Sequence, residues 1–472
     1  MLPFNRNYAI FPSVFEVGKE TEIKILGCGR AFFPFEGEEY DITLIPVDAD
    51  VLDYHNPDTH IKIKAKASDG VIRFNYTPER EQRHLVYLEK NGKKLGEFSA
   101  YALNSDLYSC RPLKGDFHVH SYRSDGTIDP SNLIGHYRSE GYDFFSLTDH
   151  NRFYPGFEAD EVFEGVKTGF VRVNGEEVHA PGCDVHIVNN GSENSVAAIY
   201  LNDKDRYDRE VEGILARLPE SVPERYRERY AKILWVVENI HREGGLATFA
   251  HPFWRPGGSM SNNVCEEFAR MLLKTVPFDG FELIGGGYES DQNCTTALWN
   301  DLRAEGVKIP VVGSSDVHSI GVPAQSFSNF FTICFAKENE AEEIKSAVKE
   351  GLSVAVRASG YGYDRGYQCH GSYRLVAYSR FLLEKYFPEQ QRILECQGEL
   401  LRRYSVGEDC AAAIETVAKM AEENYERFFG KREPLYPTKE MLEFEDKWRE
   451  VQMKGPHTKG SHIYGSPETR QI

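Results

Sequence analysis

Residues 116–126 of the chain read DFHVHSYRSDG, with two histidines two positions apart and an aspartate soon after them. Alternate side chains of a β-strand point to the same face, so His118 and His120 can reach one point if this stretch is a strand. The Ser-Asp-Gly that follows is typical of a turn, and a turn at a strand end can direct the Asp125 carboxylate back toward that point. The stretch therefore predicts three donors that converge on a cation.

Apolar runs typical of strands alternate with helix-like segments from residue 116 onward. The strand-like runs include FFSLTDH, LATFAHP, IPVVGSSDVHS, NFFTICFA and SVAVRA, and segments such as PSNLIGHYRSEGYD and ENEAEEIKSAVKEG separate them. Repeated alternation of this kind predicts a parallel sheet covered by helices, either a barrel or a doubly wound sheet. The fold class that we expect for this part of the chain is α/β.

Histidines and acidic residues stand at the ends of these apolar runs, where α/β folds build their sites. The set comprises His118, His120, Asp125, His150, the pair Glu176 and Glu177, His186, His251, Asp316 and His318. Buried imidazoles and carboxylates cost free energy unless they are paired or bound to metal. With one glutamate of the pair, nine donors are too many for one ion, which takes about four to six. We therefore expect two or three ions that share a carboxylate.

The donor types indicate the metal and its chemistry. Imidazole and carboxylate donors without thiolates fit zinc, manganese or iron, whereas so much imidazole disfavours calcium. Adjacent divalent ions bring the pKa of a bridging water near neutrality and stabilise an oxyanion that develops on a substrate. The chemistry that this donor set predicts is hydrolysis.

Taken together, the elements HVHS, SDG, TDHN, GEEV with a following His, AHP and SDVH resemble the PHP family, named for its polymerase and histidinol-phosphatase members. The resemblance covers roughly residues 113–358, about half of the chain. As an ordered set the elements are specific, whereas each one alone is weak. The resemblance implies a distorted (β/α)7 barrel with a trinuclear metal centre.

The resemblance also implies which donors hold which ion. The first metal would take His118, His120, Glu177 and Asp316, the second Glu177 as a bridge with His186 and His251, and the third Asp125, His150 and His318. Glu177 is preferred because the family motif places its glutamate two residues after the glycine, here Gly175. The register that uses Glu176 stays open. The stretch APGCDV before His186 departs from the common pattern.

Other polar residues near these motifs are expected to play supporting or structural roles. Asp149 is expected to orient the His150 imidazole or to close a strand end, and His179 to support the ligands without binding metal. His136 and His241 fall in helix-like segments. Cys183 is expected to be structural, and the nine scattered cysteines favour reduced thiols.

The flanking regions differ in pattern from the central part. Residues 1–110 contain short runs rich in Val, Ile, Tyr, Phe and Thr between turn residues, which predicts a β-sandwich-like domain. Charged stretches within residues 191–232 predict a largely helical insertion, either solvated or placed over the pocket. Residues 372–455 predict a helical C-terminal extension, a candidate surface for a homo-oligomer, and residues 456–472 a loose tail.

Composition narrows the class of partners. The formal net charge of -18 argues against a nucleic-acid partner bound by bulk electrostatics. The N-terminus lacks the pattern of a secretory signal, and no apolar run approaches the roughly 18 residues of a membrane span. We expect a soluble, cytoplasmic protein without a membrane partner.

We expect a phosphoesterase that acts on a small phosphorylated substrate. A metal-bridging hydroxide would attack the phosphorus in line while the ions hold the non-bridging oxygens, with Glu177 and Asp316 central to catalysis as ligands. Arg255, four residues after His251, is the leading candidate for an anion anchor, and Arg123 is another. Trp254 would face an aromatic leaving group or simply pack.

Two alternatives remain open. A branch of the same superfamily that resembles carbaryl hydrolase has similar motifs behind an N-terminal extension and cleaves carbamate or amide bonds, so a carbamate, amide or carboxyl-ester hydrolase is the first alternative. Metals polarise carbonyl and phosphoryl oxygens alike, so ligand motifs do not decide between them. The second is a non-catalytic ligand-binding protein, in which the β domain recognises a sugar or protein. The complete set of ligand motifs argues against an inert barrel.

Overall fold

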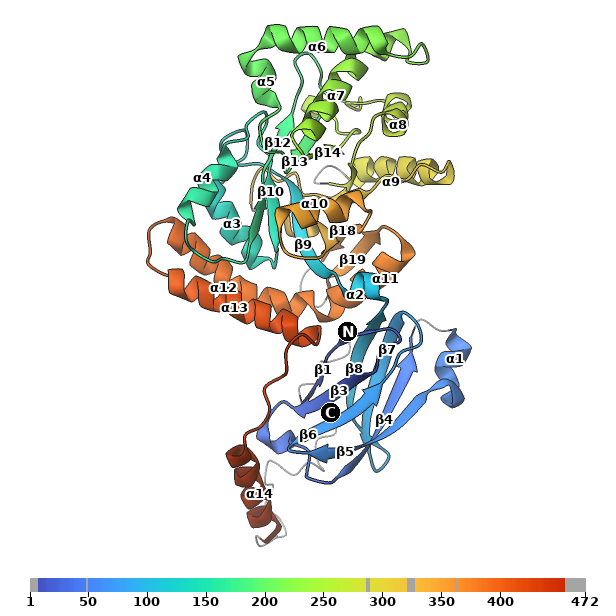
Figure 1. Ribbon diagram of the computed structural model, residues 1–472, viewed down its shortest axis with the longest axis vertical. Helices are drawn as coiled ribbons and strands as arrows, with labels where there is room; N and C mark the ends of the chain where they lie inside the picture. The colour runs from blue at the N-terminus through green and yellow to red at the C-terminus, as the bar shows by residue number, and fades with distance from the viewer. Residues whose placement is uncertain (1–6, 48–49, 286–288, 321–326, 361–363, 455–472) are drawn as a thin grey trace. The chain divides into compact units, whose positions relative to one another are not determined.

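The computed structural model describes residues 7–47, 50–285, 289–320, 327–360 and 364–454 (Figure 1). The described part of the chain divides into a larger unit, Leu103–Phe428, and a smaller unit that comprises residues 7–102 and 429–454. The loose tail expected at residues 456–472 lies outside the described residues. None of the described helices combines the length and the apolar character needed to cross a membrane.

The larger unit is α/β and contains two sheets. The six-stranded sheet has the order β11 (Val171–Val173), β10 (Phe144–Leu147), β9 (Arg111–Val119), β17 (Phe330–Ala336), β18 (Ser353–Ser359) and β19 (Gly366–His370). The five-stranded sheet has the order β12 (Gly175–Val178), β13 (Ile187–Asn190), β14 (Leu246–Phe249), β15 (Gly280–Ile284) and β16 (Val311–Gly313). Two isolated parallel bridges, Val119 with Val317 and His150 with Glu177, join the strand ends of one sheet to those of the other.

The strand directions are mixed, so the expectation of a parallel sheet is wrong. Strands β9, β10 and β11 are parallel, as are β14, β15 and β16. By contrast, β13 is antiparallel to both of its neighbours, and β17, β18 and β19 add antiparallel pairs. Only residues 179–186 connect β12 to β13. A parallel connection needs about a dozen residues or more, so this short loop forces the reversal.

Helices of the larger unit surround these sheets. They are α2 (Ser105–Tyr108), α3 (Pro130–Ser139), α4 (Pro155–Val162), α5 (Ala197–Asn202), α6 (Lys204–Arg217), α7 (Glu224–Arg242), α8 (Glu266–Thr275), α9 (Glu289–Ala304), α10 (Ala341–Lys349), α11 (Tyr373–Lys385), α12 (Phe387–Ser405) and α13 (Ala411–Phe428). Helix α3 begins where the sequence predicts, since the Asp129 carboxylate accepts hydrogen bonds from two backbone N–H groups and Pro130 occupies the first turn.

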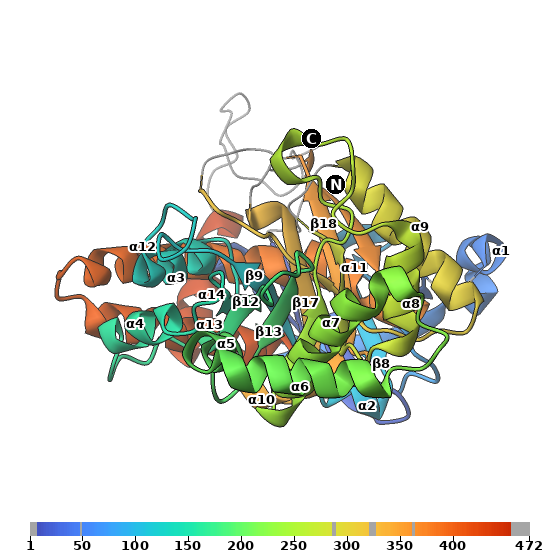
Figure 2. The same cartoon turned by 90° about the horizontal axis from the view of Figure 1, so that it is seen from above.

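Helices α5, α6 and α7 form the segment between β13 and β14. This segment contains the charged stretches within residues 191–232 that predict a helical insertion. Helix α6 lies beside α7 (Figure 2), and the Trp235 indole donates a hydrogen bond of 2.7 Å to Glu210. Their apolar faces join the core that covers the five-stranded sheet, with Trp235 and Phe249 buried. The charged side chains of the segment are therefore left on the opposite face.

The smaller unit is built on one eight-stranded sheet of order β1-β3-β6-β5-β4-β7-β8-β2. Its strands are β1 (Tyr8–Phe11), β2 (Val14–Glu16), β3 (Thr21–Gly27), β4 (Glu39–Pro46), β5 (Ile61–Ser68), β6 (Val71–Tyr76), β7 (Gln82–Lys90) and β8 (Lys93–Leu103). Apolar side chains from all of these strands share one core, so the sheet curls around it. The short helix α1 (Val51–His55) belongs to the same unit.

The helical region expected at residues 372–455 is divided between the two units. Helices α11, α12 and α13 belong to the larger unit, whereas α14 (Lys439–Lys454) belongs to the smaller one. Two contacts within the smaller unit explain the division. Lys24 pairs with Glu433 at 2.6 Å, and the Arg449 guanidinium lies 3.6 Å from the centre of the Phe35 ring.

Candidate metal centre

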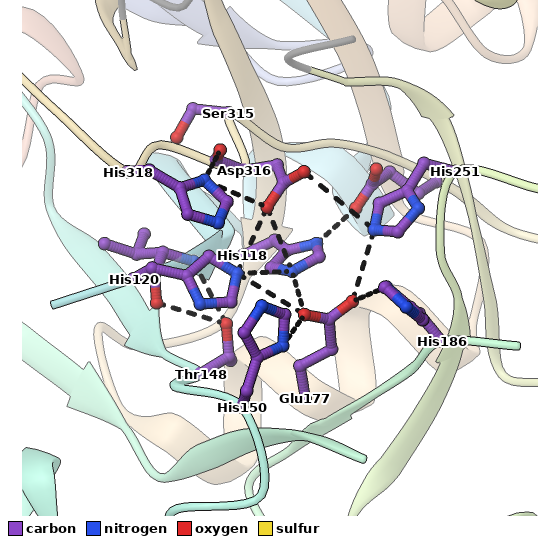
Figure 3. Close-up of polar contacts among 12 residues, drawn as sticks. His118, His120, Thr148, His150, Glu177, His186, His251, Ser315, Asp316 and His318 are labelled. Carbon is purple, nitrogen blue, oxygen red and sulfur yellow. Dashed lines mark hydrogen bonds and ion pairs between the residues drawn. The ribbon is translucent and has the colours of Figure 1, made fainter. Parts of the chain in front are cut away.

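Four donor atoms from strand ends of the two sheets meet at one point (Figure 3). The Nε2 atoms of His118 and His120 lie 3.1 Å apart, and each lies 3.4 Å from Glu177 Oε2. Asp316 Oδ1 lies 3.4 Å from His118 Nε2 and 3.1 Å from His120 Nε2. Tetrahedral ligands with metal bonds of about 2.0–2.1 Å lie roughly 3.3 Å apart. The five distances among these atoms therefore lie in the range expected for ligands of one metal ion.

The Glu177 carboxylate connects this set to a second one. Its Oε2 atom faces His118 and His120, whereas its Oε1 atom lies 2.7 Å from His186 Nδ1 and 3.2 Å from His251 Nε2. His186 immediately precedes β13, which runs antiparallel to β12 and β14, so it falls at the same sheet edge as the residues that follow those strands. A carboxylate with histidines on both oxygens has the arrangement of a bridging ligand.

A third set of donors surrounds Asp125. Its Oδ2 atom lies 3.3 Å from His150 Nε2 and 3.3 Å from His318 Nε2. Together with a ring nitrogen of His120, these donor atoms all lie within 4.8 Å of one another. The structure thus brings together all nine residues that the sequence analysis singled out as ligands.

Buried atoms of this cluster lack hydrogen-bond partners among the described residues, which tests whether a metal fits. They include Glu177 Oε2, Asp316 Oδ1, His150 Nδ1, His186 Nδ1, His179 Nε2 and His251 Nδ1. Each buried polar atom left unpaired costs about 1–3 kcal/mol. Divalent cations would remove that cost, and the mixture of imidazole and carboxylate suits zinc, manganese or iron.

Glu176 and Glu177 lie on opposite faces of β12. The Glu176 carboxylate accepts hydrogen bonds from the Ser195 hydroxyl at 2.7 Å and from the Val196 backbone N–H at 2.6 Å. It therefore fixes the chain that leads into α5. Because side chains alternate along a strand, only Glu177 faces the histidines.

Glu282 is a member of the site that the sequence analysis missed. Its Oε2 atom lies 2.9 Å from His118 Nδ1, which turns His118 Nε2 toward the other donors. Glu282 lies in β15, within the buried run FELI. An isolated acidic residue in an otherwise apolar buried strand was the available signal.

Asp149 and Asp116 fix the loops that carry the ligands. Asp149 accepts hydrogen bonds from the backbone N–H and hydroxyl groups of Ser121 and Ser124, so it supports the loop before Asp125 instead of orienting the His150 ring. Asp116 accepts hydrogen bonds from the backbone N–H of Ser315 at 3.0 Å and from the Tyr137 hydroxyl at 2.9 Å.

Asp316 itself has a positive φ of 49°, which only a constrained loop retains. Its backbone N–H donates a 3.0 Å hydrogen bond to the His118 carbonyl. The loop is thereby tied directly to β9, and the Asp316 carboxylate reaches His120.

Neighbouring charges change the pKa values of the imidazoles. Burial lowers the pKa of His150, but Asp125 and Glu177 outweigh burial and raise it to about 10. Burial is likewise outweighed at His251, where Glu177 and Asp316 raise the pKa to about 9. Burial prevails at His186 and lowers its pKa to about 4 despite Glu177. Without a cation, the carboxylates therefore hold protons on some of the imidazoles.

The two arginines considered as anion anchors are engaged by carboxylates. Arg255 Nε lies 3.6 Å from Asp291 Oδ1, and Arg123 Nε lies 2.9 Å from Glu158 Oε2. The Trp254 ring centre lies 5.6 Å from that of His186. Trp254 also lines a small cavity with His251 and Glu282.

Of the remaining histidines and cysteines discussed above, His241 and Cys183 have evident structural roles. His241 Nε2 lies 2.8 Å from Asp279, and the Cys183 side chain is buried in the core. His136 is half-buried in α3. His179 is different, because its Nε2 atom lies 3.6 Å from Glu177 Oε2.

No protein-family model matches the sequence, and no curated protein matches it. Solved structures resemble parts of it. One is a two-domain protein from Bacteroides vulgatus containing a predicted PHP-like metal-dependent phosphoesterase, with 20% identity and a TM-score of 0.34 over 52% of this chain. The match spans 65% of that protein, less than two thirds of its length.

Two further solved structures resemble a smaller share of the chain. A candidate metal-dependent phosphoesterase from Bifidobacterium adolescentis shares 20% identity, with a TM-score of 0.32 over 44% of this chain and 89% of the other. An amidohydrolase from Chromobacterium violaceum, solved with sulfate and no metal, shares 18% identity, with a TM-score of 0.30 over 44% of this chain and 88% of the other. The description of the Bacteroides vulgatus protein names the family that the sequence motifs resemble.

Proposed function

We propose that this chain is a metal-dependent hydrolase of the PHP type that cleaves a phosphoester bond in a small molecule. The observation that carries the proposal is the donor set of His118, His120, Glu177 and Asp316, in which the two imidazoles lie 3.1 Å apart and each lies within 3.4 Å of both carboxylates. Glu177 extends the set to His186 and His251, so ions at both positions would share a carboxylate.

The proposed architecture is a distorted (β/α)7 barrel within residues 113–358. The bridges Val119 with Val317 and His150 with Glu177 would close a ring of β9, β10, β12, β13, β14, β15 and β16. The proposed ligands lie within the last residues of these strands, or directly follow or precede them, at one edge of the ring. This arrangement supports a single site at the barrel mouth.

The chain's own residues would hold and orient the ions. His118, His120 and Asp316 surround the first position, His186 and His251 the second, and Asp125, His150 and His318 the third, with Glu177 shared. Divalent ions bound there supply Lewis acidity, which lowers the pKa of water and stabilises negative charge that develops on the substrate. Glu282 keeps His118 oriented, and Asp116 and Asp149 keep the ligand loops in place.

The charge of such a centre favours an anionic substrate. The three ligating carboxylates, Asp125, Glu177 and Asp316, carry three negative charges, whereas three divalent ions would carry six positive ones. The excess positive charge lies in a site with a buried floor, where it is screened less than at the surface. A phosphoester would be attracted and its non-bridging oxygens neutralised.

Hydrolysis of a carbamate, amide or carboxyl ester is the second candidate. The observation that favours it is the pairing of Arg255 with Asp291 and of Arg123 with Glu158, which neutralises the two expected phosphate anchors. In addition, the cavity beside His251 is lined by the acidic Glu282 and Asp291. A neutral carbonyl substrate would not be repelled by these carboxylates.

One assay separates these functions. Protein reconstituted with manganese, zinc or iron would be given nitrophenyl forms of a phosphomonoester, a phosphodiester, a carboxyl ester and a carbamate, and nitrophenol release would be measured. We expect phosphoester turnover that disappears in Asp316→Ala. Turnover of only the carboxyl ester or carbamate would favour the second candidate. Metal binding without turnover of any substrate would favour the hypothesis of a non-catalytic ligand-binding protein.

A further inference from the structure

We propose that His179 is a tenth protein ligand of the metal cluster, on the side of Glu177 that faces His150. The inference rests on the proposed function only in assuming that the cluster binds divalent ions. The resemblance to the PHP family assigns His179 no such role, and the sequence motif alone indicated a supporting residue.

The geometry around Glu177 Oε2 carries the inference. His179 Nε2 lies 3.6 Å from this oxygen, and His150 Nδ1 lies 2.7 Å from it. The three atoms all lie within 4.8 Å of one another, as metal ligands do. All three are buried and have no hydrogen-bond partner in the described part of the chain. A cation placed among them would satisfy all three at once.

His150 presents both of its ring nitrogens to carboxylates. Its Nε2 atom faces Asp125 at 3.3 Å, and its Nδ1 atom faces Glu177 at 2.7 Å. If Nε2 serves the ion near Asp125, Nδ1 can bind a second ion only when the ring releases its remaining proton to solvent and bridges the two ions as an imidazolate. His179 supplies the additional donor that makes the Nδ1 side of His150 a second coordination position.

The ring of His179 is held in place by its neighbours. It stacks on the His186 ring, with centroids 3.8 Å apart and an interplanar angle of 21°. The stack holds the His179 ring nearly parallel to the His186 ring. His186 Nδ1 lies 2.7 Å from Glu177 Oε1. The stacked rings of His179 and His186 therefore face the two different oxygens of the Glu177 carboxylate.

Residues from two other segments fix the backbone of His179. Its N–H donates a 2.8 Å hydrogen bond to Asn151 Oδ1, and its carbonyl accepts one of 3.1 Å from the Tyr200 hydroxyl. The same hydroxyl donates to Asn151 Oδ1 at 2.7 Å. Tyr200 lies in α5, so the helical segment between β13 and β14 positions His179. Tyr200 is a positioning residue in this arrangement.

Metal affinity in the full-length chain tests the inference. Wild type, His179→Gln and Tyr200→Phe would be stripped with a chelator and titrated with Co²⁺, with metal content per chain and the visible absorption of bound Co²⁺ as readouts. His241→Gln is the matched control, because His241 binds Asp279 and takes no part in the cluster.

We expect His179→Gln to weaken one class of bound Co²⁺ by more than about 100-fold, beyond the range of a residue that only orients a ligand, and to change its visible spectrum. Tyr200→Phe should have a smaller effect on the same class, and His241→Gln none. Unchanged affinities and an unchanged spectrum in His179→Gln would overturn the inference. If His179→Gln does not fold, Tyr200→Phe decides, and wild-type behaviour in that variant overturns it.

The same titration separates this inference from the proposed function. Wild type that binds no Co²⁺ contradicts both. Wild type that binds Co²⁺ and hydrolyses a nitrophenyl substrate, together with an unaltered His179→Gln, contradicts only the role of His179.

Discussion

Glu176 and Glu177 are adjacent in β12, and their carboxylates lie on opposite faces of the strand with different partners. Glu177 lies 2.7 Å from both His150 and His186, whereas Glu176 accepts hydrogen bonds from Ser195 and Val196. One carboxylate belongs to the candidate metal centre and the other to the packing of the chain before α5. This pair gives a matched comparison of two buried glutamates.

Glu177→Gln should lose metal, whereas Glu176→Gln should retain it. An amide carries no negative charge, so the loss of Glu177 should lower the affinity for at least one ion by more than about 100-fold. Metal content per chain after dialysis measures this. Glu176→Gln should instead lower the thermal stability, and equal metal content in the two variants would contradict the bridging role of Glu177.

Glu282→Gln should weaken metal binding without abolishing it. Glu282 accepts from His118 Nδ1 at 2.9 Å, and a partner of this kind orients the ring and strengthens its other nitrogen as a donor. We expect a loss of about 10-fold to 100-fold in metal affinity. Competition with a chromophoric chelator gives the dissociation constants. Wild-type affinity in this variant would assign Glu282 a purely structural role.

Metal binding should release protons and weaken as the pH falls. Carboxylates raise the pKa of His150 to about 10 and that of His251 to about 9 against the effect of burial, so both rings are protonated near neutral pH in the metal-free protein. A metal binds neutral imidazole, so it must displace these protons. Calorimetric titration in buffers of different ionisation enthalpy measures the protons released.

The metal-free protein should lose stability as the pH rises. A folded-state pKa above the unfolded value of about 6.5 means that protonated His150 and His251 stabilise the fold. That stability is complete below pH of about 6.5 and is lost as the pH rises through about 9 and about 10. Thermal unfolding of chelated protein across this range checks the sign, and the metal-bound protein is the control.

A buried histidine of the smaller unit should make that unit sensitive to acid. Burial lowers the pKa of His84 to about 4, and its Nε2 atom lies 3.1 Å from the Tyr76 hydroxyl. Since the folded-state pKa is depressed, the stability that neutral His84 contributes is present above pH of about 6.5 and is lost as the pH falls through about 4.

The size of this loss has an upper limit of about 3.5 kcal/mol, since the pKa falls from 6.5 to about 4 and each pKa unit corresponds to about 1.4 kcal/mol. Denaturant unfolding at neutral and acid pH would be compared between wild type and His84→Gln. The variant should lose less free energy of unfolding on acidification. If the free energy of unfolding falls equally with pH in wild type and His84→Gln, His84 is not the cause of the acid sensitivity.

Arg255→Ala tests whether this arginine anchors a phosphate despite its pairing with Asp291. A charged hydrogen bond is worth about 1.5–3 kcal/mol, so kcat/KM for a phosphoester should fall by about 10-fold to 100-fold with metal content unchanged. Arg123→Ala is the comparison, because Arg123 is bound to Glu158. A drop of only a few-fold across several phosphoesters would remove Arg255 as an anchor.

The sequence predicted which histidines and carboxylates the structure brings together, because each stands near the end of an apolar run. His118, His251 and Asp316 are examples, and the structure brings them together from separate strands. The alternation of strand-like and helix-like segments likewise predicted an α/β unit, because the two periodicities differ visibly along the chain.

Long-range partners were not visible in the sequence. Glu282 is 164 residues from His118, and nothing local to FELI indicates that the two side chains meet. The direction of β13 depends on the short connection from β12. The apolar pattern of the strand does not distinguish a parallel from an antiparallel neighbour. The attachment of α14 to the smaller unit depends on the contacts of Lys24 with Glu433 and of Arg449 with Phe35. The two partners in each contact lie far apart in the chain.

The two isolated bridges between the sheets of the larger unit have a consequence for how the protein matures. His118 and His120 come from the six-stranded sheet, whereas Glu177 and Asp316 come from the five-stranded one. Ions at the centre would clamp this seam between the two sheets, in addition to the two bridges and to hydrogen bonds such as that from the Asn190 side-chain amide to the Phe117 carbonyl. A chain synthesised under metal starvation should therefore open along this seam and be cut there by proteases, and resupply of metal should rescue its abundance.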